Sequence, residues 1–241
     1  MSYVFPDWPA PINVRSVCTT RLGGVSQAPF DSFNLGDHVG DDPRAVFANR
    51  AQLCDELQLP SEPFWLEQVH GTQVLAPGQV RCGDASISCE AGEVLSIMTA
   101  DCLPVLLCDQ AGTVVAGAHA GWRGLCEGVL ENTVSAMECD PAEIMVWLGP
   151  AIGPNAFEVG DEVREAFVAH APIAGLAFTL GREAGKWMAD IYLLARQRLE
   201  AMGITAIYGG EYCTHTQEDL FYSYRRDKTT GRMASLIWMA S

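Results

Sequence analysis

His119-Ala120-Gly121-Trp122-Arg123-Gly124 is the segment in which the chain passes from a predicted strand to a predicted helix. The strand is predicted at 113–118, where an apolar run ends at the histidine, and the helix at 121–138. Turns of this kind expose backbone N–H groups at the start of a helix, and such groups bind anions readily. The segment therefore places an imidazole next to a predicted anion-binding turn.

Strands and helices alternate on both sides of this segment without a strict strand-helix-strand rhythm. Asp41-Asp42-Pro43 opens a predicted helix that runs to about Leu57. Hydrophobic periodicity and turn residues predict the other elements, which are strands at 12–20, 94–99, 103–108, 144–148 and 234–239 and helices at 161–169 and 186–202. We therefore predict a mixed α/β (α+β) fold, a sandwich of mixed β-sheets with flanking helices, in a single domain over 1–241.

The length and composition of the chain limit its class. With 241 residues, of which 49% are hydrophobic, the chain is long enough to bury a full core. No apolar run approaches the roughly 18 residues that a membrane span needs, and residues 1–30 lack the pattern of a signal peptide. The nine cysteines form no CxxC pair, which favours reduced thiols over a disulfide framework. We therefore expect a cytoplasmic protein.

The charge of the chain indicates the kind of partner. Fifteen basic and thirty acidic residues give a net charge of −15 at pH 7, which repels nucleic acid and anionic lipid. The one dense basic cluster, Arg225-Arg226-Asp227-Lys228 with Arg232 close behind, is sufficient for a small anion and too small for a duplex. A small-molecule substrate is therefore expected, with no nucleic acid and no membrane as partner.

Two histidines and one cysteine lie in polar turns, and the motifs of both histidines contain glycine. They are His70 in Gln68-Val69-His70-Gly71, Cys102 in Thr99-Ala100-Asp101-Cys102, and His119. Zinc prefers imidazole and thiolate ligands, and ligands from three separate turns suit a catalytic site with an open coordination position. No local zinc-finger or HExxH pattern is present. The residues alone therefore leave two interpretations open, a metal site or three buried polar side chains.

Motifs spread over almost the whole chain carry a family resemblance. Besides the three segments above they are Cys18-Thr19-Thr20-Arg21-x-Gly23-Gly24-Val25-Ser26, Asn34-Leu35-Gly36, Gly40-Asp41-Asp42, Asn49-Arg50, Gly149-Pro150-x-Ile152-Gly153, Phe157-Glu158-Val159-Gly160, Cys213-Thr214 and Phe221-Tyr222-Ser223-Tyr224-Arg225-Arg226-Asp227. With them the chain resembles the laccase-domain family, described as multicopper polyphenol oxidases, as a peptidoglycan editing factor and as purine nucleoside phosphorylases. One departure is Asp84-Ala85-Ser86-Ile87-Ser88, where many relatives have Asp-Ala-Leu-Val-Thr.

The resemblance implies a zinc site. The family's zinc ligands are the histidine of its QVHG motif, the cysteine of its TADC motif and the histidine of its HAGWRG motif, which match His70, Cys102 and His119. A true laccase needs a blue copper and a trinuclear copper cluster, for which five histidines without a His-x-His pair are too few. A single site of this kind could still bind copper, since divalent copper outcompetes zinc at most nitrogen and sulfur sites.

The resemblance also implies a purine nucleoside and phosphate as substrates. Phosphorolysis of adenosine-, inosine- or guanosine-type nucleosides is the predicted reaction, with adenosine deamination and methylthioadenosine phosphorolysis as further activities to test. Asp101 is a candidate for orienting a ligand or accepting a proton, although an acid in a turn is often a cap. The arginines suit phosphate but could instead form surface salt bridges, and Asn34 could contact a base edge or ribose. The candidate substrate-binding residues are Arg21, Asn34, Arg50, Arg123, Arg226 and His215.

Three other functions stay open. In a peptidoglycan-editing amidohydrolase acting on a cell-wall precursor, Cys102 would be the nucleophile and His119 its base, with Asp101 as orienter. A copper-dependent polyphenol oxidase is the second. The third is a zinc-stabilised binding module, in which Cys213 or His215 would complete a closed four-ligand site. A zinc-bound thiolate is a poor free nucleophile, so metal binding and attack by Cys102 tend to exclude each other. We expect a monomer.

Overall fold

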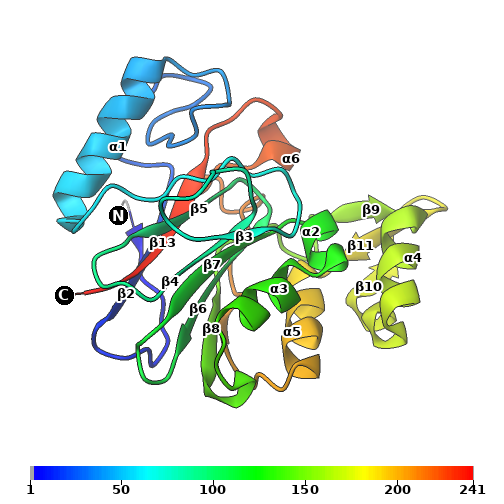
Figure 1. Cartoon of the computed structure of the whole chain (residues 1–241). Coiled ribbons are helices and arrows are strands. Elements are labelled where there is room, and N and C mark those ends of the chain that lie inside the picture. The colour runs from blue at the N-terminus through cyan, green and yellow to red at the C-terminus, as the bar shows by residue number, and fades with distance from the viewer. Residues whose placement is uncertain (1–2, 241) are drawn as a thin grey trace.

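A computed structural model describes residues 3–240, in which the strands form three sheets (Figure 1). The six-stranded sheet has the order β12 (Ala206–Gly209), β8 (Ile144–Leu148), β6 (Leu103–Asp109), β7 (Val115–Ala120), β4 (Ala85–Ser88) and β3 (Val74–Leu75). The four-stranded sheet has the order β1 (Tyr3–Val4), β2 (Val14–Thr19), β13 (Met233–Met239) and β5 (Leu95–Thr99). The three-stranded sheet has the order β10 (Phe178–Leu180), β11 (Lys186–Ala189) and β9 (Glu158–Gly160). The largest sheet is mixed. Its edge strands pair in parallel, β12 with β8 and β3 with β4, and the other pairs are antiparallel.

Strands β6 and β7 form the centre of the fold and are buried along their whole length. Side chains alternate along β6, so that Val105 faces a core shared with helices and Leu106 faces a core shared with the four-stranded sheet. Gly117 of β7 lies so close to that sheet that a Cβ atom there would be 3.0 Å from Ile97 Cγ1. Because both faces are covered, these strands have the continuous apolar sequence typical of buried strands.

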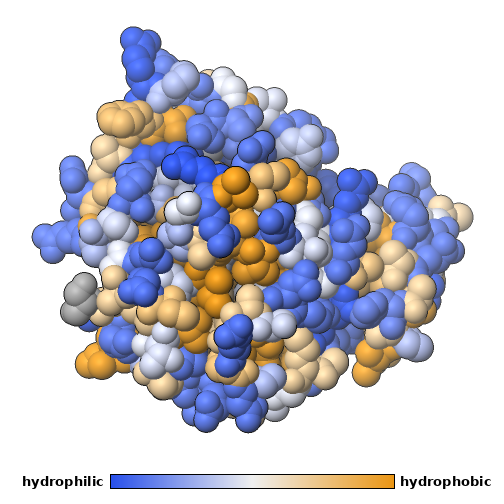
Figure 2. Space-filling model, viewed as in Figure 1, coloured by the Kyte–Doolittle hydropathy of each residue, from blue (hydrophilic) through white to orange (hydrophobic). Residues whose placement is uncertain are grey.

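Helices flank the sheets. They are α1 (Pro43–Leu57), α2 (Trp122–Glu127), α3 (Val129–Ala136), α4 (Asp161–His170), α5 (Ile191–Ala201) and α6 (Tyr224–Asp227), with short 3-10 helices η1 (Pro141–Glu143) and η2 (Pro172–Ala177). Figure 1 shows α3 and α5 beside the six-stranded sheet, α4 with the three-stranded sheet at one end, and α1 at the other. Hydrophilic residues cover most of the face drawn in Figure 2, and hydrophobic ones gather near its centre. None of the described helices is both long and apolar enough to cross a membrane.

The structure confirms the predicted fold class. Every predicted strand is present, with ends that differ by at most two residues, and the helices predicted at 43–57 and 161–169 are α1 and α4. His119 lies within β7 rather than after it. All nine cysteines are free thiols. Six short strands, β1, β3, β4, β9, β10 and β12, and the short helix α6 have no predicted counterpart.

Two predicted helices are wrong in part. The helix predicted at 121–138 is divided into α2 and α3 by Gly128, whose φ of 103° is a conformation that glycine adopts readily and that interrupts a helix. The helix predicted at 186–202 begins only at Ile191, where Asp190 caps it by accepting a hydrogen bond from Leu193 N. The residues before the cap form β11, which pairs with β9 and β10. Periodicity alone does not separate a short strand from the first turn of a helix.

Asp109 organises the turn between β6 and β7. Cys102 directly precedes β6 and His119 lies near the end of β7, so both are at the ends of these strands that are far from the turn. The buried carboxylate of Asp109 accepts hydrogen bonds from Thr113 N at 2.7 Å, Thr113 Oγ1 at 2.7 Å and Val114 N at 3.0 Å. Burial raises the pKa of this carboxyl group, but the hydrogen bonds outweigh burial and hold the pKa below its ordinary value. The charged form therefore stabilises the turn.

We expect Asp109→Asn to lower the free energy of unfolding at neutral pH by about 2 kcal/mol, a typical value for hydrogen bonds to a charged group. Because the pKa of Asp109 is depressed in the folded state, its stabilisation is present above the unfolded-state pKa of about 4 and is lost as pH falls through the folded-state pKa. The difference between wild type and variant should therefore shrink below about pH 4. Urea denaturation across this range measures it, with the exposed Asp219→Asn as control. A difference that is constant with pH would contradict the assignment.

Candidate functional site

Three turns bring His70, Cys102 and His119 together. His70 lies in the loop before β3, Cys102 in the turn from β5 to β6, and His119 near the end of β7. Their ligand atoms all lie within 4.8 Å of one another. Among residues 3–240 this is the one cluster of three or more metal-ligating side chains, and neither Cys213 nor His215 joins it. The three residues predicted from their turns therefore converge and leave room for a fourth, non-protein ligand.

The donor set and its spacing fit a metal ion. Cys102 Sγ lies 3.8 Å from His70 Nε2, and the rings of His70 and His119 meet edge to face with centroids 4.7 Å apart. Two ligands of a tetrahedral zinc ion are on the order of 3.5 Å apart, given bond lengths of about 2.3 Å to sulfur and 2.0 Å to nitrogen. A Cβ atom at Gly121 would be 2.9 Å from His70 Cδ2 and 3.1 Å from Cys102 Sγ. The lack of a side chain at this position keeps the space around the ligand atoms open.

Asp84, the residue just before β4, holds both histidines in place. Its fully buried carboxylate accepts hydrogen bonds from the backbone N–H groups of Val69, His70 and Gly71 at 3.1, 2.8 and 2.7 Å. The same carboxylate lies 2.8 Å from His119 Nδ1. Burial raises the pKa of Asp84, and the bonds from His119 and the backbone more than compensate, so its pKa is lowered. His119 therefore keeps Nε2 as its free ring nitrogen, and the QVHG loop has a fixed conformation.

Cys102 and His119 influence each other's ionisation. Burial disfavours the charged form of both groups. Coulombic attraction and hydrogen bonding to the two histidines nevertheless lower the pKa of Cys102 to about 6. The Cys102 thiolate and the Asp84 carboxylate in turn raise the pKa of His119 to about 9. The lowered pKa of Cys102 favours its thiolate, which is the form of cysteine that coordinates metals.

Asp101 ties the turn before Cys102 to two distant segments. Its carboxylate accepts hydrogen bonds from Thr214 Oγ1 at 2.7 Å and from Arg225 N at 2.6 Å, and its backbone oxygen accepts one from Ile152 N at 2.9 Å. Its φ is 96°, in the region that side chains disfavour. Asp101 thus positions the wall of the site through these contacts, and each of its carboxylate oxygens accepts one hydrogen bond from the protein.

A cavity of about 190 Å³ opens beside Cys102. Its walls are mostly apolar and aromatic, with few polar groups. The lining residues are Ala100, Asp101, Cys102, Trp122, Ile152, Phe157, Ile191, Tyr224 and Arg225. An apolar cavity with a small number of convergent polar groups is typical of a small-molecule site. The candidate metal ligands therefore adjoin a space shaped for an organic ligand.

Asn34 and Arg50 make their contacts within the protein. Asn34 is fully buried, its amide nitrogen donates to a backbone oxygen and to Asp41 Oδ2, and its oxygen accepts two backbone N–H groups. The Arg50 guanidinium donates twice to Leu35 O and lies over the Trp65 ring, with Cζ 4.1 Å from its centroid. Both side chains hold the loop between β2 and α1.

Arg21 and Arg226 hold loops as well. Arg21 donates to the backbone oxygens of Asp31 and Glu218 and pairs with the Asp31 carboxylate at 3.3 Å. Arg226 donates to the backbone oxygens of residues 214, 215 and 221 and pairs with Asp227 at 2.8 Å. A guanidinium engaged in this way has few N–H groups left for a substrate. The guanidinium groups of these two predicted phosphate ligands thus make hydrogen bonds and ion pairs within the protein.

Arg123 and His215 are the remaining predicted substrate-binding residues. Arg123 is exposed at the start of α2, with Cζ 5.1 Å from the centroid of the Trp122 ring. His215 is half-buried and lines a second cavity together with Arg225. Both therefore stay candidates for contact with a ligand.

Asp84 and Arg225 have no counterpart among the predicted site residues. Asp84 stands before a strand that was not predicted, so nothing in the local pattern shows that its carboxylate turns inward. A signal for Arg225 is present, because it belongs to the dense basic cluster at 225–228. The choice of Arg226 over Arg225 within that cluster depends on side-chain direction, which only the structure gives.

The fold and the site define a mixed α/β protein with a candidate metal centre of two histidines and a cysteine beside an apolar cavity. Residues 15–240 match the family model described as multi-copper polyphenol oxidoreductase laccase. The chain belongs to this family, as its motifs predict.

Relatives of the chain share nearly its whole length. It is 57% identical over 240 residues to a protein of Pseudomonas aeruginosa named purine nucleoside phosphorylase, covering 99% of this chain and 98% of the other. It is 56% identical over 240 residues to purine nucleoside phosphorylase YfiH of Escherichia coli, with 98% of each covered. A crystal structure of a Neisseria meningitidis protein, 50% identical, matches with a TM-score of 0.95 over 100% of both chains. YlmD from Geobacillus stearothermophilus, 32% identical, matches with a TM-score of 0.92 over 100% of this chain and 97% of YlmD.

We expect Asp84→Asn to weaken zinc binding about 10- to 100-fold, the usual effect of removing the hydrogen-bond partner of a metal ligand. The amide nitrogen of asparagine would face N–H groups that now donate to the carboxylate, and His119 would lose its fixed orientation. Competition titration with a chromophoric chelator measures the affinity. Asp109→Asn, which alters another buried carboxylate with backbone donors, is the matched control and should bind zinc like wild type. Equal affinities of wild type and Asp84→Asn would refute the positioning role.

Proposed function

We propose that this chain is a zinc-dependent purine nucleoside phosphorylase that uses phosphate to split the glycosidic bond of adenosine, inosine or guanosine. The structural observation that carries the proposal is the apolar, aromatic cavity directly beside the cluster of His70, Cys102 and His119. The relatives named purine nucleoside phosphorylase, which are 57% and 56% identical to it, support the same reaction.

His70, Cys102 and His119 would hold the metal. Zinc is proposed because imidazole and thiolate are its usual ligands and because three protein ligands leave one coordination position open. A zinc ion bound in this way supplies a Lewis acid for a phosphate or a water molecule. Residues 3–240 contain a single cluster of this kind, whereas a multicopper oxidase needs several copper sites. A mononuclear site therefore suits phosphorolysis, and deamination as a second activity, better than laccase chemistry.

The cavity beside Cys102 has the walls that a purine base requires. Trp122, Phe157 and Tyr224 contribute aromatic rings, which stack on planar heterocycles. Ile152 and Ile191 complete the apolar lining and keep water from the base. Because Asp101 binds Arg225 N, the helix that carries Tyr224 is held against the turn that carries Cys102. The protein therefore holds the base and the polar centre at a fixed separation, which favours a reaction between bound groups.

The decisive measurement is product formation by the zinc-loaded protein. With adenosine, inosine, guanosine or methylthioadenosine plus phosphate, we expect free base and the sugar 1-phosphate in equal amounts. Conversion of adenosine to inosine without phosphate would report deamination. Removal of the metal should abolish turnover, and Cys102→Ser should do the same because the metal loses a ligand. Adding zinc should restore turnover to the metal-stripped wild type and not to the variant. No product above the metal-stripped control would contradict the proposal.

Two further outcomes separate the other candidate functions. A covalent adduct on Cys102 formed with a cell-wall precursor would support an amidohydrolase in place of the proposed phosphorylase function. Phenol oxidation by copper-loaded protein, with no nucleoside turnover with any metal, would support an oxidase function instead.

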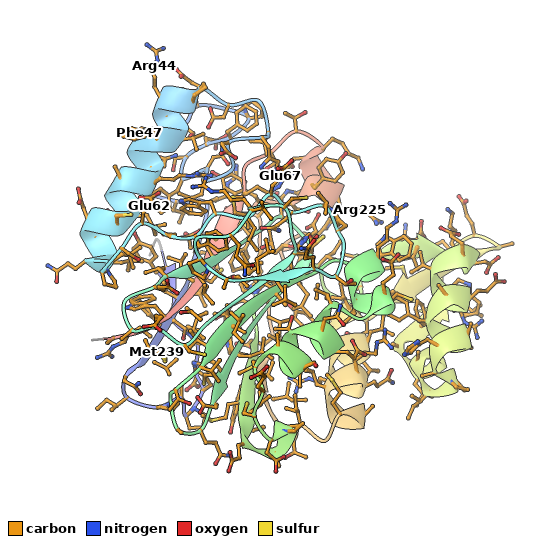
Figure 3. All side chains as sticks on the ribbon, in the orientation of Figure 1. Arg44, Phe47, Glu62, Glu67, Arg225 and Met239 are labelled. Atoms are coloured by element: carbon orange, nitrogen blue, oxygen red, sulfur yellow. The ribbon has the colours of Figure 1, made fainter. Side chains whose placement is uncertain are left out.

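We expect Tyr224→Ala to raise the KM for nucleoside roughly 5-fold, because a stacking ring contributes about 1 kcal/mol. Tyr224 is 54% exposed, so its loss should leave the fold intact, and Tyr224→Phe, which keeps the ring, should behave like wild type. Phe47→Ala is the matched control, since Phe47 is 76% exposed on α1, away from the site (Figure 3). Steady-state kinetics measure the change. A KM for Tyr224→Ala equal to that of wild type would place the base elsewhere.

A further inference from the structure

Arg225 carries a guanidinium group that makes no ion pair with a carboxylate among residues 3–240. The side chain is half-buried, its Nη1 donates to Glu158 O at 2.6 Å, and its Cζ lies 5.5 Å from the centroid of the Phe157 ring. None of the acidic side chains in the described part of the chain forms an ion pair with it. Figure 3 shows Arg225 on the side of α6 that faces the three-stranded sheet. Its remaining N–H groups are therefore available to an anionic ligand.

A second, more polar cavity of about 530 Å³ shares Arg225 with the apolar cavity beside Cys102. Arg182, from the turn between β10 and β11, and His215 also line this polar cavity, and Asn155 adds a side-chain amide. Glu158 is the one acidic residue among its lining residues. Two guanidinium groups and an imidazole therefore meet one carboxylate, which makes this cavity locally cationic in a chain whose net charge is −15.

The two segments that carry Arg225 and His215 are tied to each other. Arg226 Nη1 donates to the backbone oxygens of Thr214 and His215, both at 3.0 Å, which holds the turn containing His215 against α6. The backbone N–H of Arg225 donates to Asp101 Oδ2, in the turn before Cys102. Arg225 and His215 are therefore fixed relative to each other and to the candidate metal ligands. A preorganised set of donors binds its ligand without having to be ordered first.

We propose that Arg225, Arg182 and His215 form a subsite for a phosphate group. This inference deepens the proposed function and rests on it for the role of phosphate as the second substrate. Guanidinium groups bind phosphate oxygens through paired hydrogen bonds, and the imidazole supplies a further donor. A phosphate bound at Arg225 adjoins a base in the apolar cavity. The polar cavity also has room for the phosphate group of a larger molecule, such as a nucleoside diphosphate, which presents the same chemistry.

Isothermal titration of the intact zinc-loaded protein with inorganic phosphate and with a nucleoside 5′-diphosphate tests the subsite without turnover. We expect Arg225→Gln and Arg182→Gln to weaken binding of the preferred probe about 10-fold. Arg44→Gln is the matched control, since Arg44 is exposed on α1, far from Arg225 (Figure 3). Tighter binding of inorganic phosphate supports the co-substrate role, and tighter binding of the diphosphate supports a phosphorylated substrate. Unchanged Kd values for both probes in both folded variants would overturn the subsite.

Kinetics distinguish failure of the subsite from failure of the proposed function. In the phosphorolysis assay, both variants should raise the KM for phosphate about 10-fold. Arg182→Gln should leave the KM for nucleoside near its wild-type value, because Arg182 lines the polar cavity and not the apolar one. Phosphate binding that depends on Arg225 in a protein that releases no base would support the subsite and overturn the phosphorylase. Full turnover with an unchanged KM for phosphate in both variants would overturn the subsite alone. Arg182 is exposed, so its variant keeps the test decisive if Arg225→Gln does not fold.

Discussion

The buried carboxylate of Asp84 is the constraint on which the candidate site depends. Burying a charged carboxylate without hydrogen-bond donors is strongly unfavourable. The three N–H groups of the QVHG loop and the imidazole of His119 are therefore required as its partners. Those partners come from a loop and from β7, and Asp84 itself precedes β4. Helix α2 then packs on the same loop, where a Cβ at Gly124 would be 2.7 Å from Gly71 O. One charge thus joins a loop and two strands around the ligand atoms, and α2 packs on that loop.

Asp101 plays the corresponding role on the side of the cavity. Its positive φ is unfavourable for a residue with a side chain, at a typical cost of about 1–3 kcal/mol, and its hydrogen bonds to Thr214, Arg225 and Ile152 hold it there. The conformation directs the next residue, Cys102, toward the two histidines. Asp84 therefore orients the imidazoles, and Asp101 orients the thiol together with the aromatic wall. Neither carboxylate has to touch a substrate to control the geometry of the site.

The sequence predicted the main strands from local signals, and the three candidate metal ligands from their turns together with the family resemblance. Apolar runs mark β5, β6 and β7, glycine-bearing turns mark His70 and His119, and a polar turn marks Cys102. The substrate-binding predictions rested on residue type alone, and type does not show which way a side chain turns. Asn34 turns inward because a loop needs its amide groups, and the unpredicted Arg225 faces both cavities because Asp101 fixes the start of its helix. Such outcomes depend on contacts between residues far apart in the chain.

The charge distribution explains how a strongly acidic chain can admit an anion at all. A net charge of −15 repels phosphate over the surface as a whole, and several arginines, such as Arg21 and Arg226, are neutralised by nearby carboxylates. A half-buried guanidinium without such a partner creates a positive potential that low-dielectric walls concentrate inside a cavity. Nucleosides are neutral and meet no comparable barrier at the apolar cavity. Because Arg225 borders both cavities, the proposed phosphate subsite would hold an anion next to the cavity proposed for the base.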